Sequence, residues 1–223
     1  MQLDFQFGGG GAHKAFRHYF RADVLPLLGA SYSAKMGEAL FQAATEVSQL
    51  LAWTAYDSGN RALADRYMLS TLRLTQVAGD RMMGARILAN ISHQANYLGQ
   101  VHRALMLARA SVEGAKAAST PREMALFSAH EARALSTAQD HKGAARAMTK
   151  GERFFERADG SDDPEWLSYM DEAELIGEFC HCFRDLGQGA QPSASPNALS
   201  SSLTLNTPAR SGSAAWCWHR ASC

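Results

Sequence analysis

The chain has 223 residues, of which 46% are hydrophobic and 20% are charged, so most of it should fold around a core. Lys plus Arg and Asp plus Glu both total 22, and without a basic excess we expect no direct nucleic-acid binding by this chain. The sequence contains no signal peptide and no apolar run long enough to cross a bilayer, so we expect a cytoplasmic protein without membrane contact.

The first eleven residues are predicted to be a linker-like segment. Residues 3–7 alternate like a short strand, and four glycines follow at 8–11. A phosphate-binding loop has a similar outline, but it requires Gly-Lys followed by Ser or Thr, whereas Gly11 is followed by Ala-His-Lys. We therefore favour a linker.

From residue 12 onward, apolar residues recur at spacings of three and four, and Ala, Leu, Arg, Met and Glu dominate, which is typical of helices. The connectors are short and polar, so consecutive helices should be antiparallel. The last helix is expected to begin at Asp-Asp-Pro-Glu-Trp (162–166), because an aspartate can cap it and Pro164 suits its first turn. The expected helices span residues 12–28, 34–57, 61–79, 82–98, 101–118, 121–138, 141–157 and 165–187.

A repeat of forty residues appears when the turns are aligned. Gly59 and Gly99 lie forty residues apart, and Gln139 takes the same place in a third copy. A glycine there permits a left-handed helix end. An alanine five residues later recurs in each copy and should allow close helix packing (Ala64, Ala104 and Ala144). The predicted fold of residues 12–187 is therefore all-α, a TPR-like antiparallel helix-hairpin solenoid.

Residues 188–223 differ abruptly from this pattern. They contain no acidic residue and no lysine, and Ser, Ala and Pro dominate, which predicts a disordered tail. The change falls where the second helix of a fourth repeat should begin. A natural flexible tail and a frameshift near residue 188 both explain it, and both interpretations stay open.

The stretch EFCHCFRDLG (178–187) looks at first like a metal site, because it places two thiols around a histidine. Successive helix residues diverge by about 100°, so Cys180 and Cys182 should point about 200° apart and cannot share one metal. The repeat register places Cys180 at the small-residue position against the next helix, with Phe179 and Phe183 at core positions, and turns Cys182 away from the inner face. Because that next helix is missing, exposure of Cys180 is compatible with this register. We expect no metal, no cofactor and no enzymatic activity.

The segments LLAWTAYDSGNRALADRYMLSTLRLTQVAGDR, ILANISHQANYLGQVHRALMLARA and DDPEWLSYMDEAELIGEFCHCFRDLG carry a resemblance that extends over residues 3–187. They resemble the C-terminal TPR-like region of actinobacterial transcriptional regulators that carry an N-terminal Cro/C1-type helix-turn-helix domain. The resemblance implies the sensor and oligomerisation half of such a regulator. The helix-turn-helix domain and the last repeats are missing, so we expect a truncated fragment.

In helix-hairpin solenoids the first helices of successive repeats line a groove that binds peptides or partners. By analogy with that family, polar and aromatic residues line the groove here. The candidates are Gln49, Trp53, Tyr56, Asn90, His93, Tyr97, Arg133 and His181. Such groups suit peptide recognition, although a groove can also be polar only because water fills it. We expect a regulatory protein-interaction or ligand-sensing module, in which homo-oligomers are allowed; a stand-alone scaffold for a protein or peptide partner is the alternative.

Overall fold

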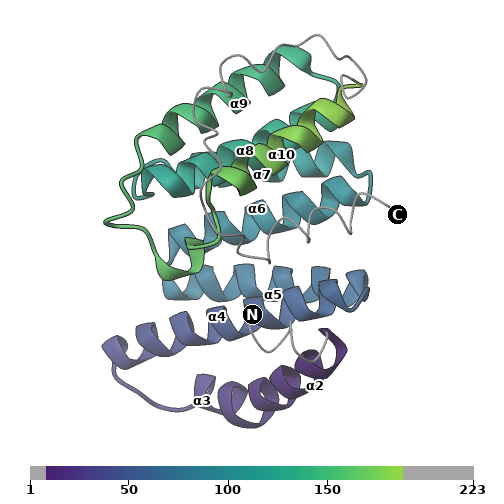
Figure 1. Cartoon of the computed structure of the whole chain (residues 1–223). Helices are drawn as coiled ribbons and strands as arrows, with labels where there is room; N and C mark the ends of the chain where they lie inside the picture. Colours follow the sequence, from purple (N-terminus) through teal and green to yellow (C-terminus); the bar gives the residue numbers. More distant parts are fainter. Residues whose placement is uncertain (1–8, 188–223) are drawn as a thin grey trace, which may run out of the picture. The chain divides into compact units, whose positions relative to one another are not determined.

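The computed structural model describes residues 9–187, with side chains from His13 onward. Every regular element in this range is a helix (Figure 1), which confirms the all-α prediction. The short strand expected at residues 3–7 and the tail expected at 188–223 lie outside the described residues. No helix in the described range has a stretch both long and apolar enough for a bilayer crossing.

The observed helix boundaries agree with the predicted ones to within three residues, except at the start of the last helix. The first predicted helix is continuous but contains a π-helical turn (Phe20–Val24). The other elements are α2 (Gly9–Tyr19), α3 (Leu25–Leu28), α4 (Ala34–Asp57), α5 (Arg61–Ala78), α6 (Arg81–Tyr97), α7 (Val101–Ala115), α8 (Pro121–Thr137), α9 (His141–Glu156), a 3₁₀ turn (Glu165–Leu167) and α10 (Glu172–Asp185).

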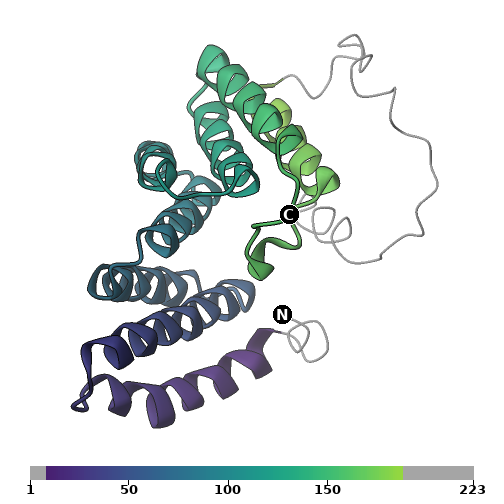
Figure 2. The ribbon, with the colours of Figure 1, turned by 90° about the vertical axis from the view of Figure 1, so that its left-hand side faces the viewer.

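The chain divides into two compact units. Of the described residues, the first unit contains those up to Gln94 together with Met106–Ala118, and the second contains Ala95–Leu105 together with those from Ser119 onward. In the first unit, α4 and α5 form a hairpin and α2 runs along α4 (Figure 2). In the second unit, α8 and α9 form a hairpin and α10 packs against α8. Adjacent helices therefore pair as the repeat predicts.

The forty-residue repeat is confirmed at the turns. Gly59, Gly99 and Gln139 all take left-handed conformations, with φ of 78°, 71° and 59°. After each of them, the next N–H donates to the carbonyl five residues back, as in Asn60 to Ala55 and Asp140 to Leu135, both at 2.9 Å. Each repeat alanine has no exposed surface (Ala64, Ala104 and Ala144).

Gln139 is the non-glycine residue among these turns, and its side chain gives a reason for its presence. Its Nε2 donates to the carbonyl of Ser136 at 3.2 Å and to the carbonyl of Asp185 at 2.7 Å. The first bond caps the end of α8, and the second ties the end of α10 to the α8–α9 turn. These bonds offset the roughly 1–2 kcal/mol that a left-handed conformation costs an L-residue.

The hydrophobic core lies between the paired helices of each unit. In the first unit it includes Leu51, Met68 and Ile87, all nearly inaccessible to solvent. In the second unit the core is built from α8, α9, α10 and the connection between the last two helices. That core contains Leu126, Leu135, Ala144, Met148, Leu167, Met170, Leu175, Phe179 and Cys182.

The predicted start of the last helix is wrong. Pro164 leads into the 3₁₀ turn, and α10 begins only at Glu172, where the Asp171 carboxylate accepts the Glu174 N–H at 2.9 Å. Leu167 and Met170 between the two capping signals are fully buried. Their burial holds the connection against the core, so the chain cannot continue as one straight helix from residue 165.

The predicted orientation of the cysteine-bearing helix also needs correction. Cys182 is fully buried in the core, whereas Cys180 is exposed and Phe183 is 44% exposed. In the described residues α10 packs on α8 and α9, so its buried face carries Leu175, Phe179 and Cys182 at helical spacing. Burial raises the pKa of the Cys182 thiol to about 11, which leaves it an unreactive small hydrophobic group at neutral pH.

Candidate functional site

The eight predicted groove residues fall into two sets. Arg133 and His181 lie in the second unit, as does Tyr97, which is 44% exposed at the end of α6. The other five lie in the first unit, on α4 and α6 (Gln49, Trp53, Tyr56, Asn90 and His93). We call these five residues the aromatic–amide face.

The aromatic–amide face is assembled by helical spacing and ring contacts. Gln49, Trp53 and Tyr56 are separated by four and three residues, so they share one side of α4. The Trp53 and Tyr56 rings meet edge to face, with centroids 5.6 Å apart. The Tyr56 ring contacts the His93 ring of α6 at 6.5 Å. Asn90 precedes His93 by one helical turn, so this ring contact brings the amide-bearing sides of the two helices together.

Two buried side-chain amides distinguish this face from a polar surface that is simply exposed to solvent. Gln49 is 4% exposed and Asn90 is 8% exposed. The Nε2 of Gln49 and the Nδ2 of Asn90 have no hydrogen-bond partner among the described residues. A buried donor without an acceptor costs about 1–3 kcal/mol. A ligand that supplies hydrogen-bond acceptors would remove this cost, and because both nitrogens are buried it reaches them only when the side chains around them move aside.

The neighbouring Gln94 shows what a structural amide looks like in the same helix. It is buried as well, but its Nε2 donates to the backbone carbonyl of Arg61 at 2.9 Å and so ties α6 to the start of α5. Ser48 and Thr71 likewise bond through their hydroxyls at 2.7 Å and join α4 to α5. Other buried side-chain atoms also lack a partner among the described residues, Gln94 Oε1 and Ser111 Oγ included, but Gln49 and Asn90 are the cases in which the atom is a side-chain amide donor.

His13 is a polar residue near this unit's core that the sequence analysis did not select. Its Nδ1 lies 3.1 Å from the Thr54 hydroxyl, and its ring lies 5.9 Å from the Tyr67 ring. Burial and the nearby charge of Arg17 lower the pKa of His13. A hydrogen bond with the backbone of Leu51 opposes this shift. The position of His13 depends on the packing of α2 along α4, and the apolar spacing of the sequence does not predict which helix α2 packs against.

In the second unit, α8 and α10 bring together five ionisable residues, which we call the ionic cluster (His130, Arg133, Glu174, Glu178 and His181). At its centre Arg133 Nη1 donates to Glu178 Oε2 at 2.9 Å, and the two side chains are only 12% and 10% exposed. An ion pair this buried needs both partners. Arg133 therefore holds α10 on α8.

Burial shifts the pKa values of three residues of the ionic cluster. Burial, together with the charges of Glu178 and Asp171, raises the pKa of Glu174 to about 7. Burial and the Arg133 charge lower the pKa of His181, although Glu178 opposes this. Burial likewise lowers the pKa of His130. Near neutral pH both imidazoles are therefore uncharged, and Glu174 is partly protonated.

No protein-family model matches this chain, and no similar protein was found among curated proteins or solved structures. The proposed function is therefore based on the chemistry of the aromatic–amide face and of the ionic cluster.

Proposed function

We propose that this chain is a helical interaction module whose first unit binds an extended peptide segment on the aromatic–amide face. The observation that carries the proposal is the pair of buried amide donors, Gln49 Nε2 and Asn90 Nδ2, that have no acceptor among the described residues. They lie on the same faces of α4 and α6 as Trp53, Tyr56 and His93.

An extended peptide fits the chemistry of this face. Its backbone presents carbonyl acceptors at regular intervals, which match side-chain amide donors, and such main-chain bonds supply affinity without demanding one sequence. The edge-to-face rings of Trp53 and Tyr56 offer apolar surface for a side chain of the peptide, and Tyr and Trp are enriched at interfaces for this reason.

The regulatory part of the proposal rests on the resemblance to sensor regions of helix-turn-helix regulators. In that setting, a peptide that bonds to both α4 and α6 favours the arrangement in which the two faces meet, and so biases any domain attached to the module. The alternative is a scaffold that binds the same peptide without a change in packing. Hydrogen exchange separates the two, because only the sensor changes amide protection beyond the residues that touch the peptide.

Binding can be tested with an array of random-sequence peptides and three forms of the full chain. We expect the unaltered chain to retain a set of peptides that a Gln49→Met/Asn90→Leu variant does not. Gln42→Met is the matched control, because Gln42 is an exposed amide on α4 and its loss should leave the set unchanged. Identical peptide sets for all three proteins would refute the proposed site.

A further inference from the structure

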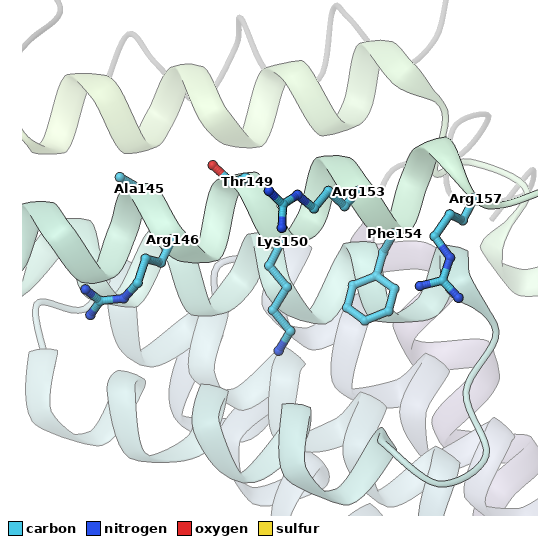
Figure 3. Close-up of a pocket in the computed structure, with 7 residues that line it drawn as sticks. All are labelled: Ala145, Arg146, Thr149, Lys150, Arg153, Phe154 and Arg157. Atoms are coloured by element: carbon cyan, nitrogen blue, oxygen red, sulfur yellow. The ribbon is translucent and has the colours of Figure 1, made fainter.

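The outer face of α9 carries a row of cations along a shallow hollow of about 510 Å³ (Figure 3). Arg146, Lys150, Arg153 and Arg157 follow one another at spacings of four, three and four residues. At about 100° per residue they fall within roughly 60° of the helix circumference. Figure 3 shows Arg146, Lys150 and Arg157 extending from the same side of α9 as the Phe154 ring.

These four cations have no carboxylate partner among the described residues. Two of them rest on an aromatic ring instead, because Lys150 Nζ and the Arg157 guanidinium each lie 5.9 Å from the Phe154 centroid. A cation–π contact orients a charge and leaves it un-neutralised. The face therefore presents a concentrated positive charge in a fixed place.

The same unit carries a complementary acidic segment, residues 159–172, which contains no basic residue. It is held in place, because Asp163 pairs with Arg122 at 2.6 Å and Leu167 and Met170 are fully buried in the core. Five further carboxylates on it belong to exposed residues (Asp159, Asp162, Glu165, Asp171 and Glu172). None of the five forms an ion pair with a cation of α9.

We propose that the acidic segment of one copy of this chain docks on the cationic face of α9 in a second copy. Within one copy the anchored segment leaves those cations unpaired, so the complementary charges are satisfied between copies. The chain as a whole has zero formal net charge at pH 7, so no long-range repulsion opposes the approach of a second molecule.

A nucleic-acid strand fits this face less well. Single strands are held by bases stacked on open aromatic rings, whereas the Phe154 ring is already occupied by Lys150 and Arg157. An acidic protein segment needs only the charges and the apolar stems of the cationic side chains.

The test is the mass of the full chain by sedimentation velocity, over a range of protein concentrations at about 50 mM and about 500 mM NaCl. We expect the mass to rise with concentration at low salt and to remain that of a monomer at high salt. A monomer at low salt would overturn the proposal. So would association that persists at high salt, because that would indicate an apolar interface.

Charge reversal identifies the two surfaces. Arg146→Glu/Arg153→Glu and Asp162→Lys/Glu165→Lys change only exposed residues, and circular dichroism checks that both variants keep their helix content. Each variant alone should associate at least about tenfold more weakly than the unaltered chain, and an equimolar mixture should recover association. Lys35→Glu/Arg66→Glu, which reverses exposed charges elsewhere, should not weaken association. A mixture that stays as weak as its components would contradict the pairing.

Discussion

Gln139 shows how one side chain can replace the conformational freedom of glycine. Its φ of 59° is a position that favours glycine, and the two earlier turns of the repeat use Gly59 and Gly99 there. The side-chain amide keeps glutamine in place by donating to Ser136 at the end of α8 and to Asp185 at the end of α10. The same residue therefore closes a turn and fixes the end of α10.

Substitutions at Gln139 should separate two contributions to the free energy of unfolding, the strain of the left-handed backbone and the hydrogen bonds of the side-chain amide. Gln139→Ala keeps the left-handed strain and loses both bonds, so we expect it to lower the free energy of unfolding by about 1–2 kcal/mol. Gln139→Gly loses the bonds but relieves the strain, so it should be close to neutral. Urea denaturation of the full chain measures both changes. Equal stability of the alanine variant and the unaltered chain would show that the amide bonds contribute nothing.

Glu174 gives a pH dependence with a defined sign. Its pKa is about 7 in the folded chain against 4.5 for the ordinary carboxyl group, so the folded state keeps this proton to a higher pH than the unfolded state. Its contribution to stability is therefore lost as pH rises from 4.5 to 7.

Glu174→Gln removes this titration, so it should raise the melting temperature at about pH 8 and have less effect at about pH 5. Thermal unfolding of variant and unaltered chain at both pH values provides the comparison. Glu172→Gln is the control, because Glu172 lies in the same helical turn but is exposed. An effect of Glu174→Gln that is the same at both pH values would contradict the raised pKa.

At the scale of the helices, the repeat alanines are fully buried near the start of the second helix of each pair. Ala64 has no exposed surface at the start of α5, whereas Ala62 in the same turn is exposed. Ala64→Leu should destabilise the chain by about 1–3 kcal/mol because the larger side chain must push α5 away from α4. Ala62→Leu should have little effect. Chemical denaturation measures the difference, and equal stability of the two variants would show that the hairpin has room for a larger residue.

The helices could be predicted because their signals are local. Apolar spacing placed α4 through α9, and the recurring glycine and alanine placed the turns between paired helices. The start of α10 could not be predicted, because the segment contains two credible capping aspartates, near Pro164 and at Asp171, and local sequence does not choose between them. The burial of Leu167 and Met170, a tertiary effect, decides it.

The relative placement of some candidate site residues could also be predicted from local sequence, whereas ligand binding by them stays a prediction. Helical spacing correctly put Trp53 and Tyr56 on one face, and the repeat put His93 on a matching face of α6, where the rings meet. The sequence could not show that the amides of Gln49 and Asn90 are buried without acceptors, because burial depends on every helix packed around them. The pairing of Arg133 with Glu178 was hidden for the same reason, since each residue alone looks like part of a solvated helix face.

At the scale of the whole molecule, the two proposals assign two kinds of partner to two kinds of surface. The aromatic–amide face offers directed donors and apolar rings, which suit one bound peptide. The cationic face of α9 and the acidic segment after it offer undirected charge, which suits a second copy. Because only the second interaction is screened by salt, the two can be studied separately.

The central claim is that Gln49 and Asn90 are free to bond to a ligand in the unbound chain. Isothermal titration calorimetry of the best array peptide, at a salt concentration that suppresses charge pairing, tests it most directly. We predict that Gln49→Met/Asn90→Leu weakens binding at least about tenfold, close to 1.4 kcal/mol. The melting temperature should stay the same or rise, because the variant no longer buries unpaired donors. Unchanged affinity, or a marked loss of stability, would show that these amides hold the fold together and do not bind a ligand.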